Sequence, residues 1–307
     1  MELLKQLIAV SGASGDESRI KQFILDYVRT SSSEWKVQPQ IIDGKEFQDT
    51  FILIFGQPRT AIYAHTDTIG FSVAYERELY KIGGPKCEDG YELVGSDDHG
   101  PIETELMVIE HENGSRSYEY VFDREIERGT ILTFKPNFTE TETFIQSPYL
   151  DNRLGVWNVL KVAETLENGA IVFSTYEEHG GNSVGFCARY LYEKYSIRQA
   201  LISDITWVTE GVPHGKGVAI SMRDSMIPRR SYLNRILDLA KASGIDFQLE
   251  VENAGGSDGS ALQKSDLLID WCFIGAPEDN VHSPHETVYK YDIMCMVELY
   301  KYLMKHL

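Results

Sequence analysis

The sequence predicts an α/β fold in which a mixed, mainly parallel sheet is covered by helices on both faces and carries a small inserted β domain. Extended and helical patterns alternate near the N-terminus and again through the second half of the chain. The middle of the chain differs, because it has short alternating stretches separated by Gly, Asp and Asn. The length of 307 residues leaves room for roughly two domains.

The N-terminal part combines one amphipathic helix with several extended segments. Ser14 and Glu17 have the S-x-x-E spacing of a capping box, which predicts a helix that continues to about Thr30. After this helix, the apolar patterns predict extended segments at residues 35–42, 50–55 and 60–64.

The second half of the chain consists of repeated α/β units. Helical periodicity predicts helices at residues 152–166, 183–194, 231–243 and 291–306. Apolar runs predict strands at residues 170–176, 200–204, 217–222, 246–251 and 267–274. Such alternation is typical of a mainly parallel sheet that helices cover on both faces.

The segment at residues 74–144 has a different pattern of apolar and polar residues. Its short alternating stretches, such as Tyr118-Glu-Tyr-Val-Phe, lie between turn residues, and no long helical period occurs there. We therefore expect a small β domain at 74–144, inserted into a discontinuous catalytic domain at 1–73 and 145–307.

Charge and composition exclude several classes of function. The chain has 29 Lys and Arg residues against 47 Asp and Glu residues, and its net charge of −18 would repel nucleic acids. No stretch approaches the roughly 18 apolar residues of a membrane-spanning helix. The cysteines lack CxxC spacing, which favours buried thiols in a reducing compartment. These features predict a cytoplasmic protein that binds neither nucleic acid nor membrane.

Side chains capable of chemistry gather where predicted strands end. A histidine or an acid at a strand end is common on its own, but ligands bind at the carboxyl edge of an open α/β sheet. The residues that share this placement are His65, Glu177, Glu178, Asp204 and His282, and Asp151 opens a predicted helix. Together they predict one site at that edge.

The types of these residues indicate metal chemistry. Two imidazoles with several carboxylates and no thiolate suit divalent ions, with zinc as the first choice and cobalt or manganese as alternatives. One carboxylate more than the ligands require would be free to move a proton. This is the set of side chains that a two-metal hydrolase needs.

Short motifs occur in order along the chain: AHTDTIGF, YLDNRLG, TYEEHGG, SD at 203–204, GKGVAI, GGSDGSA and VHSPHE. As an ordered set they resemble the M42 family of dinuclear metallo-aminopeptidases, which are related to the M28 and M20 peptidases. The resemblance runs over nearly the whole chain and implies a phosphorylase/hydrolase-like sheet. The insertion between Asp67 and Asp151 also resembles M42, because M20 relatives carry their extra domain later and M28 relatives have almost nothing there.

The resemblance implies which side chains hold two metal ions. One ion would be held by His65 and Asp204, and the second by Glu178 and His282. Asp151 would bridge the two ions.

The same resemblance implies two further roles. Glu177 would be the general base, and Asp67 would orient the ring of His65. Relatives also have a cis peptide bond directly after the bridging acid, which here joins Asp151 to Asn152.

The chain departs from the family pattern at several places. Thr68 stands where relatives often have an acid, and His179 stands where they usually have an apolar residue. His179 could face solvent or belong to the pocket. The insertion is shorter than is typical, although the family's large tetrahedral assemblies still imply a homo-oligomer.

We therefore predict a metal-dependent aminopeptidase that acts on short peptides. A metal-dependent deacylase on small amides is an alternative, and so is a catalytically degenerate binding protein. A polysaccharide hydrolase with Glu177 and Glu178 as its acid pair is not expected, because adjacent strand residues point to opposite faces.

Overall fold

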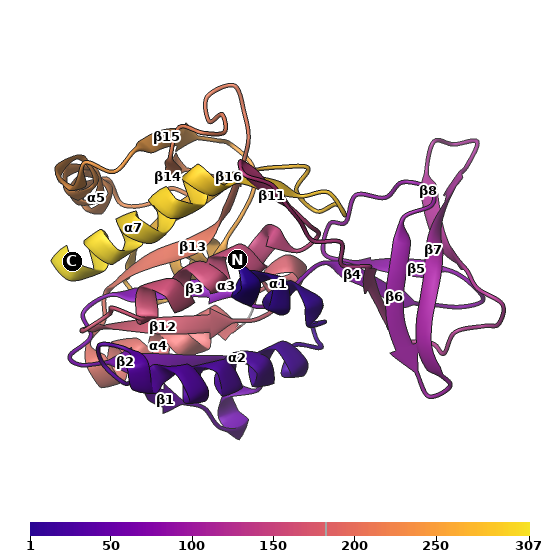
Figure 1. Cartoon of the computed structure of the whole chain (residues 1–307), viewed down its shortest axis with the longest axis horizontal. Coiled ribbons are helices and arrows are strands. Elements are labelled where there is room, and N and C mark those ends of the chain that lie inside the picture. Colours follow the sequence, from indigo (N-terminus) through magenta and orange to yellow (C-terminus); the bar gives the residue numbers. More distant parts are fainter. Residues whose placement is uncertain (182) are drawn as a thin grey trace.

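A computed structural model describes residues 1–181 and 183–307 and contains one large and one small sheet (Figure 1). The large sheet has the order β1-β2-β12-β3-β13-β16-β17-β11-β10, and β14 and β15 continue it beside β16. Its strands are β1 (Gln40–Ile42), β2 (Phe51–Phe55), β3 (Ala61–His65), β10 (Thr139–Glu140), β11 (Phe144–Gln146), β12 (Gly169–Ser174), β13 (Gln199–Trp207), β14 (Val218–Arg223), β15 (Phe247–Val251), β16 (Asp270–Asp279) and β17 (Thr287–Tyr289).

The centre of the large sheet is parallel. Strand β12 pairs in parallel with β3, β3 with β13, and β13 with β16, whereas β2 and β14 join the sheet in antiparallel orientation. The carboxyl ends of the four central strands therefore lie at one edge. The predicted mixed, mainly parallel sheet is confirmed.

Helices cover both faces of this sheet. The apolar cluster on one face packs against α1 (Glu2–Ala9), α2 (Ser18–Ser31), α3 (Leu150–Ala163), α5 (Arg230–Ser243) and α7 (Lys290–His306). The cluster on the other face includes α4 (Ser183–Tyr195) and α6 (Asp258–Lys264).

The strand residues alternate between these two clusters. On β3, Ile62 and Ala64 pack on the first face, whereas Ala61 and Tyr63 pack on the second. A strand buried on both sides has no polar alternation, which explains why these segments read as continuous apolar runs.

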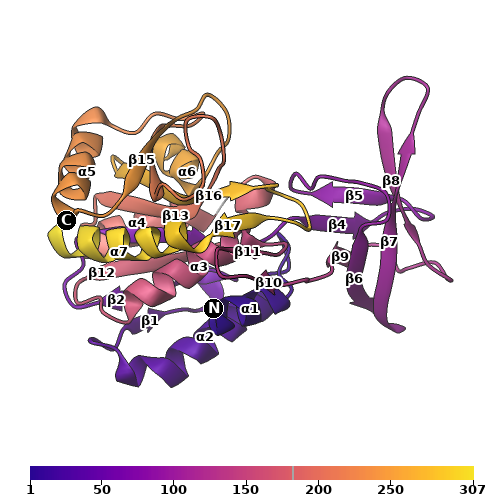
Figure 2. The same cartoon turned by 45° about the horizontal axis from the view of Figure 1, so that its top comes forward.

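The small sheet is antiparallel and has the order β5-β4-β9-β6-β7-β8. Its strands are β4 (Gly70–Val73), β5 (Leu79–Ile82), β6 (Glu92–Asp97), β7 (Gly100–Glu110), β8 (Arg116–Val121) and β9 (Ile131–Phe134). In both views it extends away from the main body (Figure 1; Figure 2). The domain division at 74–144 stays a prediction; β4 precedes that range, and β10 lies within it but belongs to the large sheet through its pairing with β11, which starts at the end of the range.

The predicted capping box is wrong. Helix α2 begins at Ser18, and the side chain of its N-cap residue, Glu17, caps nothing. The hydroxyl of Ser14 instead donates to Asp67, and the Glu17 carboxylate accepts the N–H of Tyr176. Both side chains are taken up by partners that are distant in sequence.

Other differences concern element bounds. Residues 35–42 were expected to be extended, but only Gln40–Ile42 is a strand, because pairing with β2 is limited to these three residues. Trp35 instead stacks on Phe55 at a centroid distance of 6.3 Å. Helices α1 and α6 lie outside the predicted elements. Among the described residues, none of the helices is both long and apolar enough to cross a bilayer.

Candidate metal centre

The structure brings the predicted metal-ligand side chains to one edge of the large sheet. His65 is the last residue of β3, Asp151 lies in the first turn of α3, and His282 lies in the loop between β16 and β17. Asp204 lies inside β13 and not at its end as predicted, because pairing with β16 continues to Trp207.

Glu177 and Glu178 do not end a strand, contrary to the prediction. Strand β12 stops at Ser174, and both acids lie on a 3-10 turn at Glu177–His179. Tyr176, directly before this turn, has a left-handed φ of 63°, which redirects the chain at the sheet edge. The expected divergence of the two side chains therefore does not follow from strand alternation.

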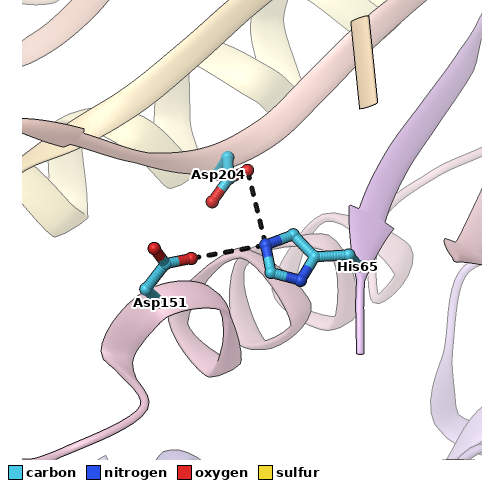
Figure 3. A group of neighbouring side chains, drawn as sticks. All are labelled: His65, Asp151 and Asp204. Carbon is cyan, nitrogen blue, oxygen red and sulfur yellow. Dashed lines mark ion pairs between the residues drawn. The ribbon is translucent and has the colours of Figure 1, made fainter. Parts of the chain in front are cut away.

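One group of potential ligands surrounds the imidazole of His65 (Figure 3). Its Nε2 atom lies 3.3 Å from Oδ1 of Asp151 and 3.6 Å from Oδ2 of Asp204. The His65 ring is buried, and both acids are less than a tenth exposed. The three side chains come from β3, α3 and β13, so the tertiary fold alone assembles them.

A second group surrounds His282. Its Nε2 atom lies 3.2 Å from Oδ2 of Asp151 and 3.2 Å from Oε2 of Glu178. In each group the potential ligand atoms lie within 4.8 Å of one another. Asp151 belongs to both groups and turns one carboxylate oxygen to each, which is the arrangement of a bridging ligand.

The donor set fits divalent cations. Burial raises the pKa of Asp204 to about 7, with the charge of Asp151 adding to the effect and His65 opposing it. Burial and the charge of Asp151 likewise raise the pKa of Glu178 to about 7, and its buried Oε1 atom has no hydrogen-bond partner among the described residues. Buried carboxylates at such distances are costly unless cations compensate them.

Asp67 organises the inner side of the site. Its carboxylate accepts the hydroxyl of Ser14 at 2.6 Å and the backbone N–H groups of Glu177 and Glu178 at 3.1 Å each. Nδ1 of His65 lies 3.4 Å from the same carboxylate and 3.2 Å from the backbone oxygen of Asp67. Although burial opposes it, hydrogen bonding with His65 lowers the pKa of Asp67.

The backbone at the start of α3 is held by Asn152. The Asp151–Asn152 peptide bond is cis, as the resemblance implies. The Asn152 side chain donates to the backbone oxygen of Ser203 and accepts the N–H of Gly155, both at 2.9 Å. A Cβ at Gly155 would lie 2.3 Å from the Ser203 oxygen, so only glycine fits there.

Glu286 is a site residue that sequence reasoning missed. Its fully buried carboxylate accepts the backbone N–H of Asp151 at 3.2 Å and of His282 at 2.9 Å. It therefore ties together the backbones of two potential ligands. Glu286 is the last residue of the VHSPHE motif, which could have indicated that it belongs to the site. Spacing alone does not reveal which N–H groups a carboxylate will accept.

His179 lies outside the cluster. It is exposed, and its Nδ1 atom accepts the N–H of Gly83 from the loop after β5 at 3.0 Å. Of the two sequence alternatives, the structure therefore favours the exposed position, with an added contact to the segment that carries the small sheet.

The comparisons with known proteins agree with this architecture. A "Putative aminopeptidase" of Acetivibrio thermocellus is 25% identical over 97% of this chain and 96% of its own length. A TET aminopeptidase from a marine sediment Thaumarchaeota archaeon has a TM-score of 0.86 at 18% identity, covering 100% of this chain and 96% of that chain. The Pyrococcus horikoshii TET1 peptidase has a TM-score of 0.78 at 22% identity, covering 99% and 98%.

The family assignment comes from a sequence model described as M42 glutamyl aminopeptidase. This model matches residues 92–299, which is more than half of the chain. The matched part includes Asp151, Glu178, Asp204 and His282, four of the potential ligands described above. The chain therefore belongs to the M42 peptidase family and is a peptide hydrolase.

Proposed function

We propose that this protein is a metal-dependent aminopeptidase that removes N-terminal residues from short peptides with water activated between two divalent ions. The observation that carries the proposal is the pair of ligand groups that share Asp151, one oxygen to each. Two such ions, when bound, would lower the pKa of a water molecule and polarise the scissile carbonyl.

The protein's own residues would hold these ions in fixed places. His65 and Asp204 would hold one, Glu178 and His282 the other, and Asp151 would bridge them. Imidazole and carboxylate ligands suit zinc, and cobalt or manganese would accept the same ligands.

Glu177 would act as the general base. Within the described residues, neither ligand group includes it, yet it lines the same cavity as Asp151 and Asp204. Its backbone N–H is fixed by Asp67 at 3.1 Å, which sets where its side chain begins. A carboxylate there can take a proton from water and deliver it to the leaving amine.

Hydrolysis of matched free and N-acetylated peptides tests the proposal. The metal-loaded protein should release the first residue of a free tripeptide and leave the acetylated peptide intact. Faster cleavage of the acetyl group would instead establish the deacylase alternative. A protein that binds both peptides and cleaves neither would be the degenerate binding protein.

Replacing Asp67 with Asn should lower metal affinity by about 10–100-fold. An amide has one acceptor oxygen, so it cannot accept from Ser14, both turn N–H groups and the His65 ring together. Metal titration followed by calorimetry measures this effect. Ser14→Ala removes only one of these donors and should cost much less; equal losses in the two variants would contradict the role assigned to Asp67.

The assembly and compartment are also proposals. We propose a homo-oligomer, supported by the Pyrococcus horikoshii TET1 peptidase, which can assemble into a tetrahedron or a large octahedral shell. Light scattering on the purified chain should give a molar mass several times 34.8 kDa. A reducing cytoplasm is supported by four cysteines that are all free thiols.

A further inference from the structure

The cavity that contains the metal-ligand side chains continues beyond them, toward β14 and β15. Its volume is about 230 Å³. Besides the potential ligands, its lining includes the apolar residues Ile205, Trp207, Phe273 and Val281. Three further acids, which come from β15 and the loops next to β14 and β15, also line the cavity and belong to neither ligand group: Asp224, Glu250 and Glu252.

The position of Glu250 relative to the metal centre follows from strand geometry. Thr206 is two residues after Asp204 on β13, so both side chains point to the same face, about 7 Å apart along the strand. The hydroxyl of Thr206 donates to Glu250. Glu250 therefore lies next to Thr206, two strand residues beyond Asp204, which is a proposed metal ligand.

Among the described residues, no Lys, Arg or His forms an ion pair with the acids at this end, although the charge of Arg223 opposes the rise that burial causes in the pKa of Asp224. Glu250 is 3% exposed and Asp224 is 8% exposed, and among the cavity's described lining residues none is Lys or Arg. The nearby Arg223 uses its Nε atom to donate to the backbone oxygens of Asp224 and Glu252, not to their carboxylates.

Asp224 and Glu250 line the cavity, and the hydrogen bonds to their side chains involve one oxygen of each carboxylate. Asp224 accepts the N–H of Met226 through Oδ1, and no donor from the part of the chain that the structure describes reaches its Oδ2. Burial raises the pKa of Glu250 to about 7, and the charges of Glu252 and Asp224 add to the effect. A positively charged group entering here would meet two buried acceptors ready to bind it.

We propose that this end of the cavity receives the side chain of the substrate's N-terminal residue and selects Lys or Arg; this inference rests on the proposed aminopeptidase function. The aliphatic stem of such a residue packs on Trp207 and Phe273, and its charged end reaches Glu250 and Asp224. A neutral side chain leaves buried carboxylates unpaired, and an acidic one is repelled by them. Although the family model is described as a glutamyl aminopeptidase, the acids that line this cavity would repel a glutamyl side chain.

A substrate panel with conservative variants tests the selection. The metal-loaded protein is assayed on the arylamides of Lys, Arg, Leu and Glu. We expect kcat/KM for Lys and Arg to exceed that for Leu by about 10-fold and that for Glu by about 100-fold. Glu250→Gln combined with Asp224→Asn should lower kcat/KM for Lys and Arg by about 10–100-fold, mainly through KM, and leave Leu within about twofold.

The matched control is Glu210→Gln. Glu210 is an exposed acid on the turn after β13 and does not line the cavity. It should leave the whole panel unchanged. Equal losses for Leu and Lys in the double variant would show that the acids hold the α-ammonium group, which overturns the side-chain assignment. A preference of the unaltered protein for Glu or Leu would also overturn it.

Calorimetric binding of free L-lysine, L-arginine, L-leucine and L-glutamate separates this inference from the proposed function, because it needs no turnover. Tighter binding of lysine and arginine that disappears in the double variant supports the inference. Binding without this preference overturns it even if peptides are hydrolysed. Hydrolysis of no arylamide or peptide, with the lysine preference intact, contradicts the proposed function alone.

Discussion

Replacing Glu177 with Gln should leave both metal ions bound and lower kcat by about 10²–10⁴-fold, or roughly 3–5 kcal/mol of barrier. Gln keeps the size of the side chain and removes the basic oxygen. The contact that fixes this position is unaffected, because Asp67 accepts the backbone N–H of Glu177 and not its side chain. Metal stoichiometry and turnover, measured on the same preparation, check both halves of the prediction.

Glu178→Gln is the matched comparison. Glu178 lies 3.2 Å from Nε2 of His282 in the second ligand group, so its loss should weaken one metal ion, and excess ion should restore part of the activity. If Glu177→Gln loses a metal while Glu178→Gln keeps both and loses only turnover, the two roles are reversed.

Replacing Asp151 with Asn should remove at least one metal ion and lower kcat/KM by about 10³-fold or more, equivalent to about 4 kcal/mol. Asp151 contributes one oxygen near His65 and the other near His282, at 3.3 and 3.2 Å. An amide offers one oxygen and one NH₂ group, so it can ligate on one side only. Metal analysis after dialysis, followed by assay with added zinc, cobalt or manganese, measures the loss.

Asp238→Asn is a suitable control for this variant. Asp238 is exposed on α5 and belongs to neither ligand group, so its substitution should leave metal content and activity unchanged. Full retention of two ions by Asp151→Asn would show that the carboxylate does not bridge, and the two-metal proposal would then need another shared ligand.

Periodicity was the strongest source of structural information in this sequence. The continuous apolar run of β3 and the helical spacing in α7 each correspond to a residue pattern that burial imposes on a single segment. Element type and the parallel sheet could therefore be predicted. Shorter elements were missed, because a helix such as α6 (Asp258–Lys264) is too short for its pattern to stand out.

The identity of the candidate site was also largely visible in the sequence. Candidate side chains could be named because strand ends meet at one edge of an α/β sheet, and the resemblance carried by the ordered motifs implied which five of them hold two ions. Their distances and the sharing of Asp151 between the groups could not be read, because they depend on how α3 packs against β3 and β13.

The sequence by itself determined the type and order of most elements and the residue types of the candidate metal centre, because burial periodicity and motif spacing are properties of single segments. Only the tertiary structure decided which polar groups meet. In the folded chain Ser14 donates to Asp67 and does not cap a helix, and Glu286 accepts the backbone N–H groups of two potential ligands. Glu250 accepts the hydroxyl of Thr206, two residues after Asp204. Polar side chains bond to whichever buried partner the folded chain brings within about 3 Å, and those partners are often more than fifty residues away.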